Sequence, residues 1–184
     1  MKTCINLIFM FFAVLAVFSC RGEDGEKGEQ GPPGSANVIY SDWFTATSYT
    51  SSTVFGITNL TYVKDAPQIT QDILDKGVVL VYGNLSGYVS TVWPVGQVSQ
   101  LPIALTYVQS GQTMTDTWSA IQTVGKMTIK FVNDKNLYTS TGLATTHKFR
   151  YIIIIPGGQP IGKSSIDYSK MSYEEVCERF NIKP

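Results

Sequence analysis

The sequence predicts a mainly β protein: an antiparallel, jelly-roll-like β-sandwich with one short internal helix and a C-terminal helix. After residue 35 the chain is rich in Thr, Ser, Tyr, Val and Ile and poor in charge, a composition that favours strands. Short apolar segments recur at intervals of roughly ten residues with turn residues between them, which is typical of sandwiches and barrels. A complete helix-capping pattern stands near the C-terminus.

The first two strands are predicted over residues 36–46 and 53–60. In the first, side chains alternate between the two faces of the strand, which places Val38 and Trp43 on opposite faces. The second strand contains the run Val-Phe-Gly-Ile-Thr-Asn-Leu.

A short helix is predicted over residues 71–76. Thr70 has the side chain of an N-cap, and Gly77 suits the position just after the last turn. At helical spacing, Ile73 and Leu74 are expected to face the core.

Six further strands are predicted from apolar or alternating segments separated by turn residues. They cover residues 78–82, 88–93, 101–108, 114–121, 126–132 and 145–155. Residues 78–82 and 152–155 are continuously apolar, so these two strands are expected to be covered on both faces.

The C-terminal helix is predicted over residues 173–180. Ser172 and Glu175 form the N-cap and N3 positions of a capping box, while Met171 and Val176 occupy the two positions of a hydrophobic staple.

Residues 1–19 are predicted to be a lipoprotein signal peptide. Lys2 is followed by an apolar run over 5–18, which is shorter than the roughly 20 residues of a membrane span, so a transmembrane anchor is the weaker alternative. The segment Val17-Phe18-Ser19-Cys20 resembles a bacterial lipobox and predicts lipidation of Cys20. Cleavage after Ser19 by the ordinary signal peptidase is the other alternative.

Residues 20–35 are predicted to be a tether between the lipidated Cys20 and a head over residues 36–184. Glycine stands at every third position from Gly22 to Gly34, which is the period of a collagen triple helix. The run is short, so a flexible spacer is the preferred interpretation; the alternative is a short triple helix nucleated by trimeric heads. The acidic residues Glu23, Asp24, Glu26 and Glu29, which follow Cys20 closely, resemble a surface-export signal.

The balanced charge of the chain argues against nucleic-acid binding. The chain carries 14 basic and 14 acidic residues, so it lacks the basic surface that nucleic acid requires.

With Cys4 in the signal peptide and Cys20 lipidated, Cys177 is alone and is expected to be buried in the terminal helix. His147 is the one histidine of the chain and is expected to be structural or exposed rather than catalytic; no metal and no cofactor are predicted.

Three sequence patterns are compared with known kinds of functional site: a nucleotide-binding loop, a pair of catalytic carboxylates and an aromatic carbohydrate platform. Residues 157–164 match the P-loop motif, but no helix pattern follows directly and the upstream region lacks α/β alternation, so a connecting loop is the preferred interpretation. A glycan hydrolase would need paired carboxylates. The candidates are Asp42, Asp65, Asp116 and Asp134. The tryptophans Trp43, Trp93 and Trp118 either line a carbohydrate platform or, as we prefer, belong to the core.

Over nearly its full length the chain resembles the collagen-like lipoproteins of Bacteroidota. The resemblance rests on the lipobox, the Gly-X-Y run, the strand segment over 37–43, the segments over 69–82 and 149–158, and the terminal helix that opens on Tyr173. It implies lipidation of Cys20, attachment to the outer membrane and a β-rich head, and it brings no catalytic residue with it.

The function predicted from the sequence is therefore that of a non-enzymatic cell-envelope lipoprotein. It is anchored in the outer membrane, at the cell surface or alternatively on the periplasmic face, and it presents a structural or binding head with a carbohydrate or protein ligand. Two alternatives are a homotrimeric, collagen-stalked adhesion head similar to C1q and a secreted hydrolase acting on glycans.

Overall fold

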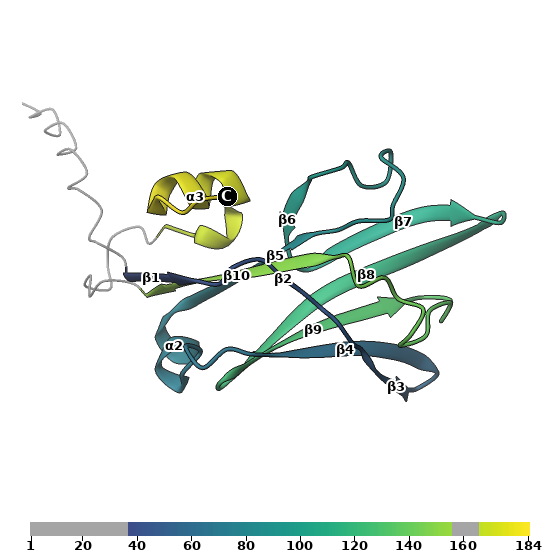
Figure 1. The fold of residues 1–184 in the computed structure, drawn as a ribbon, viewed down its shortest axis with the longest axis horizontal. Coiled ribbons are helices and arrows are strands. Elements are labelled where there is room, and N and C mark those ends of the chain that lie inside the picture. Colours follow the sequence, from purple (N-terminus) through teal and green to yellow (C-terminus); the bar gives the residue numbers. More distant parts are fainter. Residues whose placement is uncertain (1–36, 156–165) are drawn as a thin grey trace, which may run out of the picture. The chain divides into compact units, whose positions relative to one another are not determined.

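The computed structural model describes residues 37–155 and 166–184, and it confirms the predicted fold class: two antiparallel sheets with a short internal helix and a C-terminal helix (Figure 1). Sheet 1 has the order β1-β10-β5-β6, with β2 pairing the start of β10. Its strands are β1 (Asn37–Tyr40), β2 (Phe44–Thr45), β5 (Val78–Asn84), β6 (Val98–Gln100) and β10 (Lys148–Ile155). Sheet 2 has the order β3-β4-β9-β8-β7. Its strands are β3 (Thr50–Val54), β4 (Ile57–Asp65), β7 (Ile103–Gln109), β8 (Gln112–Thr123) and β9 (Lys126–Asn133).

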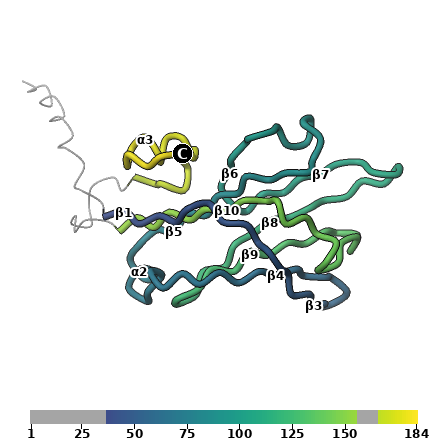
Figure 2. The backbone as a smooth tube through the Cα atoms, viewed as in Figure 1, coloured from purple at the N-terminus to yellow at the C-terminus, as the bar shows by residue number. Residues whose placement is uncertain are grey.

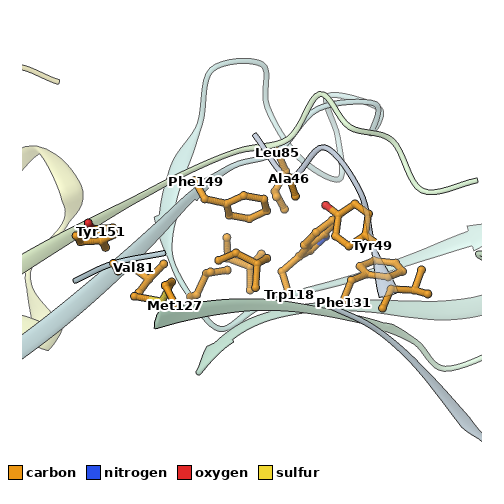
Figure 3. Close-up of a cluster of buried hydrophobic side chains, with 14 of the residues drawn as sticks. Ala46, Tyr49, Val81, Leu85, Trp118, Met127, Phe131, Phe149 and Tyr151 are labelled. Carbon is orange, nitrogen blue, oxygen red and sulfur yellow. The ribbon is translucent and has the colours of Figure 1, made fainter. Parts of the chain in front are cut away.

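The main core lies between the two sheets. Alternate residues of β8 and β9 point inward, and Trp118 and Phe131 meet there with ring centroids 4.6 Å apart. Phe149 reaches them from sheet 1, with its ring 5.5 Å from that of Trp118 (Figure 3). All three side chains are at most 1% exposed. Each therefore contributes roughly 2–3 kcal/mol of hydrophobic stabilisation and fixes how the sheets face each other.

A second core covers the other face of sheet 1. Leu80 of β5 and Ile152 of β10 belong to it, together with Val176 and Cys177 of α3 (Tyr173–Phe180). The continuously apolar sequences of β5 and β10 are thus explained, because both strands are covered on both faces as predicted. Cys177 is buried in the terminal helix, which confirms that prediction as well.

The start of α3 has the predicted capping box. The Glu175 amide donates to Ser172 Oγ at 3.2 Å, and the Ser172 amide donates to Glu175 Oε2 at 2.7 Å. A short 3-10 helix, η1 (Tyr168–Lys170), precedes it. None of the helices in the part of the chain that the structure describes is long and apolar enough to cross a membrane.

The guanidinium of Arg150 attaches the C-terminal segment to sheet 1. Its Nε donates to the carbonyl oxygen of Ser41 at 2.9 Å, and its Nη1 donates to the hydroxyl of Tyr173 and to the carbonyl oxygen of Lys183, both at 2.7 Å. Arg150 is only 4% exposed, so these acceptors compensate for the loss of its hydration.

The internal helix α2 (Gln71–Lys76) has the predicted bounds. The Ile73 amide donates to Thr70 Oγ1, and Ile73 is buried in the main core. Gly77 ends the helix with an extended backbone rather than a left-handed one. A Cβ atom at Gly77 would lie 2.8 Å from the carbonyl oxygen of Ile73, so glycine is needed for space.

The strand predicted over 36–46 is interrupted. β1 and β2 flank a break in which Ser41 takes part in two hydrogen bonds with the backbone of Tyr151. The break rotates the chain, so Trp43 packs in the same core as Val38 and not on the opposite face. The predicted alternation was wrong there because it assumed an unbroken strand.

The strand predicted over 53–60 is in fact a hairpin. Phe55 and Gly56 form a two-residue turn between β3 and β4, with φ of 50° and 78°. Two positive φ angles define a type I′ turn, for which Asn-Gly is the usual sequence. The side chain of Asn136 supports this turn by donating to the Gly56 carbonyl oxygen at 2.7 Å and accepting from the Thr58 amide at 2.8 Å.

The strand predicted over 88–93 is absent. The amides of Val92 and Trp93 both donate to the carbonyl oxygen of Val89, which folds the segment into a helical turn. On the side away from β10, β5 pairs instead with the short β6, which the sequence did not indicate. The remaining strands are found with ends shifted by a few residues.

Candidate ligand pocket

A pocket of about 590 Å³ opens at one end of the sandwich. Three segments line it: the loop after β5, the end of β7, and the segment between β9 and β10. Its lining includes the aromatic rings of Tyr88, Tyr107 and Tyr138, together with His147 and Leu143. A cavity of this size suits a small molecule or a single side chain of a partner.

Beneath the pocket lies a buried carboxylate, that of Asp116, which is 0% exposed. Tyr88 donates to its Oδ2 at 2.8 Å and Tyr107 donates to the same oxygen at 3.1 Å. Asn133 donates from Nδ2 to Oδ1 at 2.7 Å. Three donors therefore converge on one carboxylate, as burial of such a group requires.

The hydrogen bonds of the cluster formed by Asp116, Asn133, Tyr88, Tyr107 and Tyr138 have a fixed direction: each hydroxyl donates toward Asp116, either directly or through Tyr107. A tyrosine hydroxyl has one proton, and Tyr107 gives its proton to the carboxylate, the stronger acceptor. In the 3.1 Å contact between Tyr107 and Tyr138, Tyr138 is therefore the donor. Burial is the main cause that raises the pKa of both Tyr88 and Tyr107 well above the usual value. The charge of Asp116 adds to this rise in both residues, after the hydrogen bond with Tyr138 in the case of Tyr107, so both phenols keep their protons.

Neighbouring strands and a turn hold this cluster in place. Asn133 lies directly opposite Asp116 in the β8–β9 ladder. Its side-chain oxygen accepts from the amides of Lys135 and Leu137, at 3.0 and 3.2 Å, which fixes the turn that leads to Tyr138. Trp118 donates from Nε1 to the Tyr88 hydroxyl at 3.1 Å and so joins the cluster to the main core.

His147 forms part of the pocket wall. It is 3% exposed, and its Nδ1 accepts a hydrogen bond from the Ser86 amide at 3.1 Å. Burial lowers the pKa of the imidazole from 6.5 to about 4, so the ring is neutral at physiological pH. Its ring packs against that of Trp118 at a centroid distance of 4.5 Å. Of the two roles expected from the sequence, structural or exposed, these contacts support the structural one.

The pocket lining carries no formal charge. Among the described residues, none of the fourteen that line the pocket is Asp, Glu, Lys or Arg, and His147 is neutral. Within the described segments, Asp116 forms no ion pair, and no group of three His, Cys, Asp or Glu side chains is placed to hold a metal ion.

The pocket and the N-terminal end of the head lie at opposite ends of sheet 1. Asn37 pairs with Ile155 at one end of β10, while Lys148, next to His147, pairs with Asn84 at the other. Seven steps of about 3.3 Å separate these ends by about 23 Å. Within residues 37–155, Figure 2 shows β1 at one end and the turns after β7 and β9 at the other.

Most residues considered from the sequence lie away from the pocket. Trp93 and Trp118 are buried in the main core and Trp43 packs in the second, as the preferred interpretation had it. Of the four aspartates considered for hydrolysis, only Asp116 belongs to the pocket cluster. Asp42 and Asp65 are exposed on other segments, and Asp134 is exposed and accepts from the Thr115 amide.

Sequence reasoning missed Tyr88, Tyr107, Tyr138 and Asn133, although one signal was present for Asn133. A two-residue turn at 124–125 pairs residue 123 with 126 and therefore Asp116 with Asn133. The tyrosines gave no such signal, because two of them lie in irregular segments.

Several predictions concern residues outside the described ranges. They are the signal peptide over 1–19, the lipidation of Cys20, the Gly-X-Y tether over 20–35, and the P-loop-like segment over 157–164.

No protein-family model, curated protein or solved structure was found to match this chain. Function must therefore be argued from the residues themselves.

Proposed function

We propose that this chain is a lipid-anchored protein of the cell envelope that presents its β-sandwich as a non-catalytic binding head. One observation carries the proposal: the pocket lies at the end of sheet 1 opposite to Asn37. A head joined to its tether near Asn37 and carrying its binding site about 23 Å away presents that site away from the attachment point.

The anchor in this proposal is Cys20, lipidated and followed by the Gly-X-Y tether. Two or more acyl chains on one residue make attachment effectively permanent, since each buried CH₂ contributes about 0.8 kcal/mol. We place the protein in the outer membrane with the head at the cell surface; the periplasmic face is the alternative.

The chemistry of the pocket supports binding rather than catalysis. Its wall offers hydroxyls, aromatic rings and aliphatic side chains, whereas Asp116 is buried and already accepts three hydrogen bonds. A glycan hydrolase needs a second carboxylate near the first. In the described part of the chain, the pocket lining supplies none.

Location is tested by a Cys20→Ala variant expressed in the native cell, with Cys4→Ala as the matched control. We expect Cys20→Ala to leave the membrane fraction and Cys4→Ala to stay in it, because Cys4 belongs to the segment that is removed. Retention of Cys20→Ala in the membrane would contradict the anchor. Protease treatment of intact cells then separates the two faces: release of head peptides indicates the surface.

Binding is tested with a pocket-filling variant. Ala144 lines the pocket, whereas Ala104 lies exposed on β7 away from it. The full-length chain in detergent is screened against a glycan array and a panel of small anions, cations and neutral compounds. Ligands of the pocket are those lost in Ala144→Trp and kept in Ala104→Trp; a panel without any such ligand would contradict a binding role for this pocket.

A further inference from the structure

We infer that the pocket binds a primary ammonium group, with the carboxylate of Asp116 as its buried counter-charge. This inference rests on the proposed function, because it names the ligand class of the same pocket. Two features carry it: the direction of the hydrogen bonds and the absence of a cation beside Asp116.

The first feature concerns the floor of the pocket, by which we mean the hydroxyl groups of Tyr88, Tyr107 and Tyr138. These hydroxyls offer hydrogen-bond acceptors to a ligand and no free donor. The hydroxyls of Tyr88 and Tyr107 donate their hydrogen bonds to Asp116, and the hydroxyl of Tyr138 donates to that of Tyr107. Only oxygen lone pairs of Tyr107 and Tyr138 are left for a ligand. A ligand group that pairs with these lone pairs must donate hydrogen bonds. An ammonium group has N–H donors and no acceptor.

The second feature is the uncompensated charge. Asp116 is fully buried, accepts hydrogen bonds from neutral groups only, and has no Lys, Arg or His ion-pair partner in the described segments. Buried charges in proteins are ordinarily paired. Tyr88 and Tyr107 both line the pocket and bond to this carboxylate, so an ammonium group that donates to the Tyr107 hydroxyl would be two hydrogen bonds away from the buried charge.

The walls suit the remainder of such a ligand. Val92 and Leu143 provide aliphatic contacts for a carbon chain, and the rings of Tyr107 and Tyr138 attract cations through their faces. No lysine or arginine lines the pocket to repel a cation. An anion would meet no positive charge and no hydrogen-bond donor among the three tyrosine hydroxyls. A sugar hydroxyl both donates and accepts, so its acceptor lone pairs would find no donor among them.

The test is calorimetric titration of the full-length chain in detergent, in a buffer free of amines. Pentylammonium is compared with 1-pentanol, which has the same chain without the charge, and with pentanoate, which reverses it. Tetramethylammonium supplies charge without N–H donors, and methyl glucoside represents a neutral sugar. Nα-acetyl-lysine methylamide is added to separate a lysine side chain of a peptide from a free amine, the source that binds more tightly being the one assigned.

We expect a primary ammonium probe to bind at least tenfold more tightly than pentanol and methyl glucoside, and pentanoate not to bind. Tetramethylammonium should bind more weakly than the primary amine. Equal binding of pentylammonium and pentanol, or no binding of any amine, overturns the inference. Binding of the glucoside alone also overturns it but leaves the pocket as a binding site, so the two failures are distinguishable.

Three variants locate the effect. Asp116→Asn removes the buried charge at constant shape, and Asp134→Asn removes an exposed charge close by as the matched control. We expect at least a tenfold loss of ammonium affinity in the first and none in the second. Tyr138→Phe, which keeps the ring at a half-buried position, should weaken the primary amine but not tetramethylammonium. If Asp116→Asn fails to fold, Tyr138→Phe decides: unchanged affinity for the primary amine refutes the inference.

Discussion

The buried imidazole of His147 should make the stability of the head fall in mild acid. In the folded state burial lowers its pKa to about 4, against 6.5 for the free side chain. The unfolded chain therefore takes up a proton first as the pH falls, and the folded state loses stability between about pH 6.5 and pH 4. A difference of 2.5 pKa units at 1.36 kcal/mol each corresponds to a loss of about 3 kcal/mol.

The perturbation that isolates this effect is His147→Asn. Asparagine keeps an acceptor for the Ser86 amide but does not titrate, and it loses the ring contact with Trp118 at every pH. We expect the variant to be less stable at pH 7.5, and its deficit relative to the natural chain to shrink by about 3 kcal/mol by pH 4. Carboxylates titrate in both proteins, so only the difference between the two profiles reports on His147.

The assay is urea unfolding of both proteins at half-unit pH steps, followed by tryptophan fluorescence. Since the chain has one histidine, NMR gives an independent reading from a single imidazole signal. If the two stability profiles stay parallel down to pH 4, or if the imidazole titrates near 6.5 in the folded protein, the burial argument is wrong.

Three further substitutions test the fold. Phe55→Asn should raise the free energy of unfolding by about 1 kcal/mol, because asparagine tolerates the left-handed conformation of the turn with Gly56 better than phenylalanine does; an unchanged urea midpoint would contradict this. Ser172→Ala should lower it by about 1 kcal/mol through loss of the cap on α3, with Ser172→Thr as the conservative control and hydrogen exchange of the first-turn amides as the measurement. Arg150→Met should cost about 2 kcal/mol or more, since three acceptors lose their donor; exchange of α3 amides at the natural rate would refute that role.

The parts of the fold that the sequence predicted are those set by local chemistry. The N-caps of both helices follow from Thr70 and Ser172, and Glu175 completes a capping box in the second helix. The strands β7, β8 and β9 follow from alternation between glycine-containing turns, and β5 and β10 from their continuous apolar runs. In each case the signal lies within a few residues of the element it specifies.

The misses occurred where distant contacts decide the local structure. The turn at Phe55 lacks the Asn-Gly signature, and it is supported by Asn136, about eighty residues away. Residues 88–93 have the composition of a strand but fold as a helical turn, in which Trp93 is buried in the core and Tyr88 bonds to Asp116. The pocket could not be predicted for the same reason, because three separate segments build it.

The two ends of the sandwich are closed in different ways, and this difference explains where a ligand can enter. Near Asn37, α2 closes the space between the sheets with Ile73 and with Ile69 just before it, both buried in the main core. At the other end Asp116 takes the inward position of β8 between Trp118 and Met114, so a carboxylate interrupts the row of buried apolar side chains there. A carboxylate there cannot be covered by aliphatic side chains, so hydroxyl-bearing loops enclose it and leave a polar opening. The end of sheet 1 opposite to Asn37 is thus the end at which this chain places its acceptor-rich surface.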